Sequence, residues 1–402
     1  MVVGSGLWVG TIVVKRTDDK IDVVGWILHR LHFFPGLMLV LIGLGILYQI
    51  SRWLPDRQRR KPSVLLGILG AAGLLGAGYL LEFQRVLRYF PASWATWLEC
   101  GALIEIVCLT GIFFGLLVWR RVPDFQAPRR RFLQAVGAGL CAAPLGAAGF
   151  GIVSRNRFEL SEVAVPIPNL PEDLDGLRIV QITDIHLSPF LSETEFSRAV
   201  DMANETRANL ALVTGDLISR RGDPLDACLR QLARLRAEAG VLGCLGNHEV
   251  YTGTERYVTE HGRKIGIDFL RQESKVLRFG HANINFVGVD YQQFQKPYLE
   301  DAERMIVPGA FNVLLSHNPD VFPVAAGQGY ALTIAGHTHG GQVNFELLHQ
   351  NVNIARYFTP YTRGLYREGN ASVYVSSGLG TIGVPIRIGA RPEVSLLRLC
   401  AI

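Results

Sequence analysis

The sequence predicts two parts of different class, an all-α transmembrane region of four helices followed by an α/β domain. Hydrophobic residues make up 49% of the 402 residues, but they are spread unevenly along the chain. Residues 33–153 contain four apolar runs long enough to cross a bilayer, whereas strand-like, helix-like and polar stretches alternate from residue 157 onward. We therefore analyse residues 33–153 and 157–402 separately and leave residues 1–32 unassigned.

The candidate membrane spans are residues 33–50, 64–81, 97–118 and 132–153. Each can satisfy its own backbone hydrogen bonds as a helix. Arginine is abundant in the loops before the second and fourth spans, and much of the net charge of +5 lies there. By the positive-inside rule, both loops are cytoplasmic. The prediction is a multi-pass protein of the cell (cytoplasmic) membrane with residues 157–402 on the extracytoplasmic side.

Two features of the membrane half allow more than one interpretation. Arg129-Arg130 precedes a Gly/Ala-rich apolar stretch, as in a twin-arginine export signal, but these arginines could equally anchor the fourth span. Glu105 lies where a carboxylate is costly, which fits either a hydrogen bond inside the helical bundle or a transport role. A membrane sensor or transporter-like protein with a ligand-binding, non-catalytic second half is therefore the alternative to an enzyme.

The six cysteines form no zinc motif and no disulfide framework. Small apolar packing residues are the expected role for all of them. A bridge between Cys228 and Cys244 stays open if this half of the chain is exported.

Five apolar runs in the second half read as buried strands, and each ends in residues that can bind metals. The runs with their polar residues are 177–183 with Asp184 and His186, 209–214 with Asp216, 241–245 with Asn247 and His248, 311–315 with His317, and 330–335 with His337 and His339. Residues 193–206 and 224–239 have helical spacing, so strands and helices alternate. This alternation places the polar residues along one sheet edge.

The polar residues at these strand ends combine carboxylates, an amide and imidazoles. Such a mixture of oxygen and nitrogen ligands suits manganese, iron or zinc better than calcium or a thiolate-bound zinc. Glycines flank His337 and His339 and allow a tight turn with close backbone approach. The sequence therefore predicts a metal site.

In order and type, the motifs D-x-H, G-D, G-N-H-E, a lone His and G-H-x-H resemble those of the calcineurin-like metallophosphoesterases, over roughly residues 177–399. Residues 374–380 and 385–387 resemble the exported YkuE/YaeI-type phosphodiesterase branch, although by themselves they read as a strand, a Gly-rich turn and another strand. The resemblance implies a four-layer α/β/β/α sandwich over residues 157–402. It also implies a metal-dependent phosphoric ester hydrolase.

Carried over to this chain, the resemblance implies two divalent metal ions. Their implied ligands are Asp184, His186, Asp216 and His339 for one metal, and Asp216, Asn247, His317 and His337 for the other. Asp216 bridges the two ions, which holds them about 4 Å apart, close enough for one oxygen to touch both. The implied catalytic residues are His248, Asp216 and Asn247. His248 matches the family's proton donor or phosphate-orienting residue, or else steadies a metal ligand from behind.

One position departs from the protein-phosphatase branch, which reads G-D-x-x-D-R-G. Ser219 replaces the second Asp, which weakens the case for phosphoprotein substrates. Arg220 keeps the spacing that would let it contact a phosphate, but an exposed, solvated arginine is the simpler interpretation.

The expected partner is a phosphate-ester substrate, and anchoring favours one that also lies at the membrane. Candidates are a lipid headgroup, a lipid-linked pyrophosphate or a cell-wall phosphate polymer. Residues 250–269, expected to be a loop over the site, show no substrate pattern. The second half lacks the basic cluster with interleaved aromatics of a nucleic-acid channel, so no nucleic acid is expected. No protein partner is implied.

Overall fold

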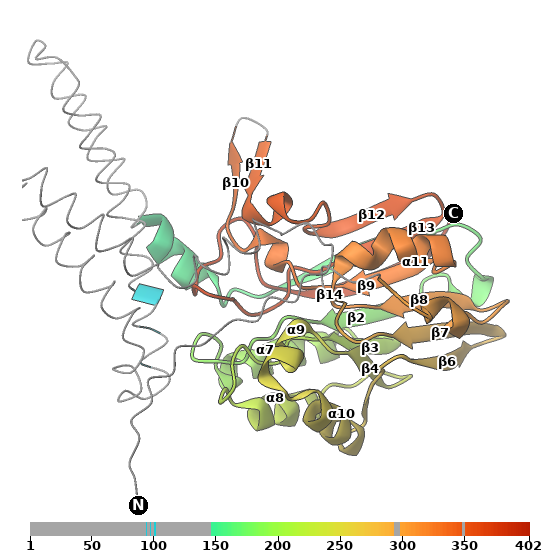
Figure 1. Ribbon diagram of the computed structural model, residues 1–402, viewed down its shortest axis with the longest axis horizontal. Helices are drawn as coiled ribbons and strands as arrows, with labels where there is room; N and C mark the ends of the chain where they lie inside the picture. The colour runs from blue at the N-terminus through green and yellow to red at the C-terminus, as the bar shows by residue number, and fades with distance from the viewer. Residues whose placement is uncertain (1–93, 95–96, 98–99, 102–145, 293–297, 348–349) are drawn as a thin grey trace, which may run out of the picture. The chain divides into compact units, whose positions relative to one another are not determined.

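The computed structural model describes residues 94, 97, 100, 101, 146–292, 298–347 and 350–402 (Figure 1). The chain divides into two compact units, Met1–Leu87 and Arg88–Ile402, and all described residues belong to the second. Almost all of the four predicted spans, together with Glu105, Arg129 and Arg130, lie outside the described residues. In the described part of the chain, no helix combines the length and apolar character needed to cross a bilayer.

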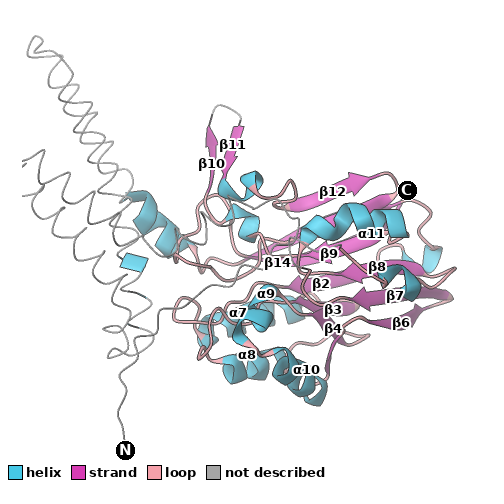
Figure 2. Ribbon diagram, in the orientation of Figure 1, coloured by secondary structure: helices cyan, strands magenta, loops and turns pink. Residues whose placement is uncertain are grey.

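Two six-stranded sheets form the centre of the second unit (Figure 2). The first has the order β1-β14-β2-β3-β4-β5, in which β2 to β5 run parallel and β14 is antiparallel to β2. Its strands are β1 Glu159–Ile167, β14 Glu393–Ala401, β2 Arg178–Ile182, β3 Leu210–Thr214, β4 Val241–Cys244 and β5 Ile267–Phe269. The carboxyl ends of β2, β3 and β4 therefore meet at one edge.

The second sheet has the order β12-β13-β9-β8-β7-β6. Its four central strands run parallel, and β12 and β6 are antiparallel to their neighbours. Its strands are β12 Gly364–Glu368, β13 Ala371–Val375, β9 Leu332–Ala335, β8 Phe311–Leu315, β7 Ala282–Gly288 and β6 Glu273–Phe279. A separate hairpin, β10 Asn344–Leu347 with β11 Gln350–Asn353, projects from this part of the fold (Figure 1).

The helices lie outside the two sheets (Figure 2). They are α7 Glu193–Glu205, α8 Leu225–Leu232, α9 Asn247–Thr252, α10 Glu255–Lys264 and α11 Phe322–Gln328, with residues 146–154 also helical. Short 3-10 helices are η1 Glu172–Leu174, η2 Ala302–Met305, η3 Pro319–Val321, η4 His339–Gly341 and η5 Ile354–Tyr357. Residues 250–269 are thus mostly helical, which corrects the expectation of a loop.

Alternating side chains of each strand enter different cores. In β3, Leu210 and Leu212 join a cluster shared between the two sheets, whereas Ala211 and Val213 pack toward α7 and α8. This period of two is the pattern of a strand buried on both faces.

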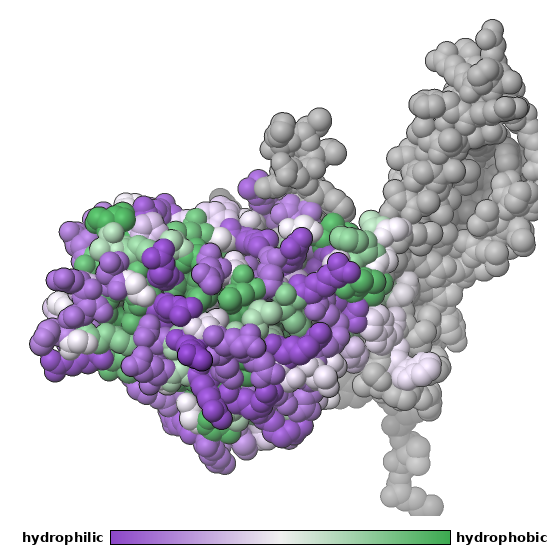
Figure 3. Space-filling model, turned by 180° about the vertical axis from the view of Figure 1, so that it is seen from behind, coloured by the Kyte–Doolittle hydropathy of each residue, from purple (hydrophilic) through white to green (hydrophobic). Residues whose placement is uncertain are grey.

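Polar residues cover most of the face in Figure 3, with apolar residues in separate patches. The mixed α/β architecture agrees with the predicted fold class.

One predicted helix is shorter than its sequence pattern suggests. Residues 224–239 have helical spacing, yet α8 ends at Leu232. The Asn204 side chain accepts a hydrogen bond from the backbone N–H of Arg236 at 2.8 Å and donates one to the carbonyl of Arg234 at 2.9 Å. These bonds give the backbone partners outside a helix, so a contact from α7 overrides local propensity.

Candidate metal centre

The predicted ligands lie where the strands end. Asp184 and His186 follow β2, Asp216 follows β3, and His337 and His339 follow β9. All five have positive φ, between 46° and 75°. Non-glycine residues rarely adopt this conformation, and it is concentrated at functional sites. The strand ends are therefore folded into tight turns that aim these side chains at a common point.

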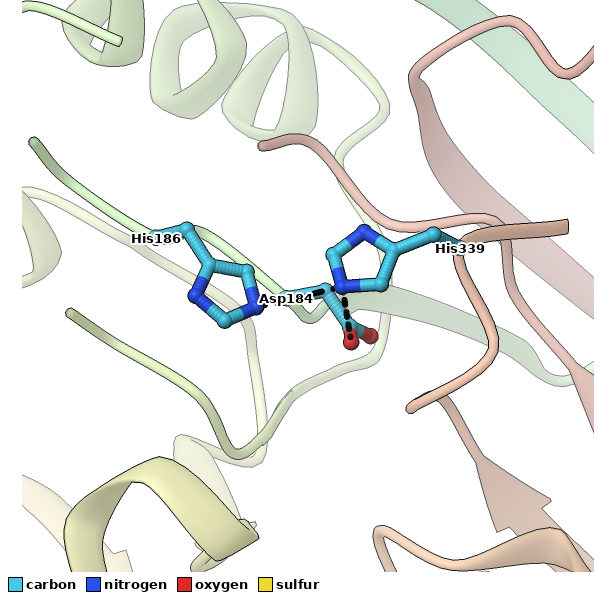
Figure 4. Close-up of side chains that lie close together, drawn as sticks. All are labelled: Asp184, His186 and His339. Carbon is cyan, nitrogen blue, oxygen red and sulfur yellow. Dashed lines mark hydrogen bonds and ion pairs between the residues drawn. The ribbon is translucent and has the colours of Figure 1, made fainter. Parts of the chain in front are cut away.

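A first group of ligands consists of Asp184, His186 and His339 (Figure 4). All three are buried, and their ligand atoms lie within 4.8 Å of one another. His339 Nε2 is 3.4 Å from Asp184 Oδ1 and 3.2 Å from His186 Nε2. Two imidazole nitrogens and a carboxylate oxygen thus face one small volume.

A second group consists of Asp216, His317 and His337, again with ligand atoms within 4.8 Å. His317 Nε2 lies 3.0 Å from Asp216 Oδ2. The same Oδ2 atom lies 3.4 Å from His186 Nε2, which belongs to the first group. Asp216 is therefore within reach of both groups.

Two buried atoms test whether these residues fit a cation. Within the described residues, Asn247 Oδ1 is buried without a hydrogen-bond partner, and the buried His317 Nε2 makes no well-aligned hydrogen bond although it lies 3.0 Å from Asp216 Oδ2. Buried polar atoms are nearly always paired, so such atoms need an explanation. Both are good ligands for a divalent cation, and both belong to the predicted set. The donors present fit a metal.

Charge inside the site points the same way. Burial opposes ionisation of Asp216, yet His317 and His186 hold the pKa of its carboxyl well below the usual value. Burial also opposes a charge on His317, but Asp216 and Asp184 raise the pKa of this imidazole to about 10. Burial, with His317 nearby, lowers the pKa of His337 to about 4. The carboxylates thus create a negative environment that favours a positive charge in their midst.

Oxygen atoms behind three of the histidines fix their orientation. The Nδ1 atoms of His317 and His248 lie 2.6 Å from the Thr214 carbonyl and 2.7 Å from the Ser219 carbonyl. His186 Nδ1 lies 3.1 Å from the Ser219 hydroxyl. A carbonyl can only accept, so Nδ1 of His317 and His248 donates a proton to it and Nε2 faces the site.

His248 lies at the edge of the two groups. Its ligand atom lies within 4.8 Å of those of His186 and Asp216, and its ring packs edge-on against His186 with centroids 4.6 Å apart. Burial lowers the pKa of this imidazole. Arg220 follows Ser219, whose carbonyl contacts His248, and its side chain is exposed.

The sequence motifs had suggested no role at the site for three residues near it, namely Glu249, Tyr291 and Arg387. Glu249 accepts hydrogen bonds from the backbone N–H groups of Asp216, Leu217 and Gly246 and so connects two ligand loops. The Tyr291 ring lies 5.7 Å from the ring of His337. Glu249 had a signal, since it ends the motif G-N-H-E and stands three residues after Gly246, the N-cap of α9, whose backbone N–H it accepts. Tyr291 had none, and Arg387 stood out only as part of the resemblance of residues 385–387.

A family model and several curated relatives show what this chain is similar to. A family model described as calcineurin-like phosphoesterase matches residues 177–341. A Danio rerio protein called "Transmembrane protein with metallophosphoesterase domain" is 31% identical, with 96% of this chain and 92% of the relative covered. "Uncharacterized metallophosphoesterase YkuE" of Bacillus subtilis and "Phosphodiesterase YaeI" of Escherichia coli are each 28% identical. Both alignments cover 67% of this chain, and they cover 97% and 98% of the relatives.

Proposed function

Because the chain belongs to the calcineurin-like phosphoesterases and is a metal-dependent phosphoric ester hydrolase, we propose that it is a membrane-anchored, two-metal phosphodiesterase. The observation that carries this proposal is the position of Asp216 between two groups of ligands. A shared carboxylate is the usual means of holding two cations close together despite their repulsion.

The proposed ligand sets follow the two groups. The first metal is held by Asp184, His186, Asp216 and His339, and the second by Asp216, Asn247, His317 and His337. When bound, the two ions supply water activation and neutralise charge on the phosphoryl oxygens. Their identity, whether manganese, iron or zinc, is left open.

The chain's own residues supply orientation and a proton. His248 keeps its Nδ1 proton on the Ser219 carbonyl, so its Nε2 atom can hold a proton for the leaving oxygen or orient the phosphate. The backbone N–H of His248 donates to Asp216 Oδ1 at 2.9 Å, which fixes the proposed bridging carboxylate relative to Asn247 and His248. Chemistry on a diester is favoured by the phosphodiesterase name of the Escherichia coli relative.

The rest of the proposal concerns the setting of the site. We read the two sheets and their outer helices as the four-layer sandwich of residues 157–402. Residues 33–153 are proposed to anchor it in the cell membrane, with the site on the extracytoplasmic side. Relatives whose names include "transmembrane" support the anchoring. A substrate confined to the same membrane surface would gain effective concentration.

The test is an assay of the full-length protein in detergent. Metals are stripped, then manganese, iron or zinc is restored, and hydrolysis of bis-p-nitrophenyl phosphate is compared with that of p-nitrophenyl phosphate. We expect restored activity with preference for the diester. Asp216→Asn and His337→Ala should each lose at least about 100-fold, since changes behind a ligand alone cost about 10–100-fold. His281→Ala, which changes an exposed histidine in a turn, is the matched control.

Two outcomes would contradict the proposal. Activity that survives Asp216→Asn and His337→Ala would remove the assigned site. Metal binding without any hydrolysis would favour the alternative, a membrane sensor or transporter-like protein.

Topology needs a separate test, namely a reporter that is active only outside the cytoplasm, fused after Ile402. A silent reporter would reverse the proposed orientation.

A further inference from the structure

Arg387 is the largest fully buried side chain among the described residues, at 1% exposure. It lies in the stretch 385–387, to which the sequence analysis could assign no role beyond architecture. A guanidinium is a permanent cation, and burying one is costly unless its donors are satisfied. Its position behind the metal centre therefore needs an explanation.

The guanidinium holds backbone carbonyls of two loops. Its Nε and Nη2 atoms both donate to the Gly380 carbonyl, Nε at 2.9 Å. Nη2 also donates to the Ser377 carbonyl at 2.8 Å, and Nη1 to the Ala390 carbonyl at 3.2 Å. Nη2 lies 3.3 Å from Nδ1 of His339, on the side of that ring opposite the metal-facing Nε2. A planar fork with five donors can serve the Gly380, Ser377 and Ala390 carbonyls at once, which a lysine cannot. Its approach to His339 is a packing contact, because Nδ1 of that ring keeps its own proton when Nε2 holds a metal.

The segment held by Arg387, residues 377–380, packs against the strand end that carries two other ligands. The backbone N–H of Gly380 donates to the Asp184 carbonyl at 2.7 Å. A Cβ atom on Gly378 would lie 2.4 Å from Asp184 Cβ, and one on Gly380 would lie 2.3 Å from the Ile185 carbonyl oxygen and 2.8 Å from His186 Cβ. Only glycine permits this contact, so the segment packs directly against the backbone that carries Asp184 and His186 and limits its movement.

A buried carboxylate holds the same segment from its other side. Glu393 accepts a hydrogen bond from the Ser377 N–H at 2.8 Å, while Arg387 takes the Ser377 carbonyl. The backbone N–H and the carbonyl of Ser377 are thus both hydrogen-bonded to buried charged side chains. Such charge-assisted bonds are stronger than neutral ones, so the segment is firmly placed.

The geometry points to Arg387 as a positioning residue for the metal held by Asp184, His186 and His339 (Figure 4). It touches His339 directly, and it supports Asp184 and His186 through residues 377–380. This inference rests on the proposed function, because it assigns Arg387 to one of two metals. Loss of Arg387 should therefore weaken binding of that metal and leave binding of the metal at His317 and His337 unchanged.

The backbone of Arg387 is itself held from outside the loop. Its N–H donates to the Gly151 carbonyl at 3.1 Å, in the helix of residues 146–154. A Cβ on Gly151 would lie 2.4 Å from the Ile386 side chain and 3.1 Å from that of Ile388. Since this helix supports the stretch that carries Arg387, the test requires the full chain.

The experiment measures metal binding to full-length protein in detergent by competition with a fluorescent zinc chelator, and metal content by mass spectrometry. We expect two zinc equivalents for the wild type. Arg387→Lys and Arg387→Met should weaken the affinity for one of the two zinc ions by about 10–100-fold and leave the affinity for the other unchanged. This is the range for residues that contact a metal ligand from behind. Arg391→Met is the matched control, because Arg391 is an exposed arginine paired with Glu159.

A double-mutant comparison assigns the affected site. His339→Ala removes a ligand of the same metal, so adding Arg387→Met to it should cost little more, whereas adding it to His337→Ala should affect both equivalents. Wild-type binding of both equivalents by the folded Arg387 variants would overturn the inference. Loss of fold in both variants, seen by circular dichroism of metal-free protein, would make Arg387 purely structural and would overturn it too. Fewer than two equivalents in the wild type would instead refute the proposed two-metal function.

Discussion

Replacing Glu249 by glutamine tests how two ligand loops are held together. The carboxylate is fully buried. Its Oε2 accepts the N–H groups of Asp216 at 2.9 Å and Gly246 at 2.7 Å, and its Oε1 accepts that of Leu217 at 2.8 Å. Glutamine replaces one oxygen by an NH2 group, which can only donate. At least one backbone N–H then faces another donor in a place that water cannot reach.

The size of the effect follows from that single lost bond. Leaving a buried donor unpaired costs about 1–3 kcal/mol, so we expect Glu249→Gln to lower the free energy of unfolding by about 2 kcal/mol. Burial, with Asp216 nearby, raises the pKa of Glu249, so removing the charge gives some relief and limits the loss. In a domain of this size, about 1 kcal/mol corresponds to about 2–4 °C in Tm, which predicts a fall of about 4–8 °C.

The assay is thermal unfolding of metal-free, full-length protein followed by circular dichroism. Glu260→Gln serves as the control, because Glu260 is an exposed glutamate paired with Arg256 on the same helix. Its Tm should stay near that of the wild type. Equal Tm values for Glu249→Gln and the wild type would refute the reasoning, since they would mean that the carboxyl group already carries a proton and that glutamine reproduces it.

Three further predictions concern the metals, a glycine and the cysteines. Chelation should lower the Tm of the metal-loaded protein, and added zinc should raise it again in proportion to the logarithm of its concentration; a concentration-independent Tm would argue against binding to the folded state. Gly380→Ala should weaken zinc binding at least about 10-fold in chelator competition, because its Cβ meets the backbone of Ile185, whereas Gly327→Ala meets nothing within 4 Å and should bind normally. Cys228 and Cys244 are fully buried and burial raises the pKa of both thiols, so maleimide should label them in urea but not in the folded protein, as mapped by peptide mass spectrometry.

The location of the site followed from a local pattern. Apolar runs that end in Asp, Asn or His mark strands whose carboxyl ends carry ligands, and parallel strands bring those ends to one edge. The structure brings together the groups around Asp216 in this way, although their catalytic and metal roles remain predictions. The mixed α/β class followed from the same alternation. These features depend on neighbours in sequence, which is why the sequence displays them.

Contacts between distant loops could not be predicted in this way. Strand β14 lies between β1 and β2, so residues more than 200 positions apart become neighbours. Arg387 reaches His339 across 48 positions, whereas its stretch by itself reads only as a strand that follows a Gly-rich turn. The early end of α8 likewise depends on Asn204 in another helix. The hydrophobic periodicity of the sequence carries no information about partners that are so far apart along the chain.

The strained backbone of the candidate metal centre is a reason to expect that losing one of its supports disturbs metal binding as well as folding. Five proposed ligands have φ values in the left-handed region, at about 1 kcal/mol or more each, so the strain amounts to about 5 kcal/mol, comparable with the whole stability of many domains. The surrounding structure must offset this strain locally. The His337 N–H donates to the Asp184 carboxylate, Glu249 takes three N–H groups, and Arg387 takes three carbonyls. We therefore expect that removing a single support lets a strained turn relax and displaces a ligand while both sheets stay folded.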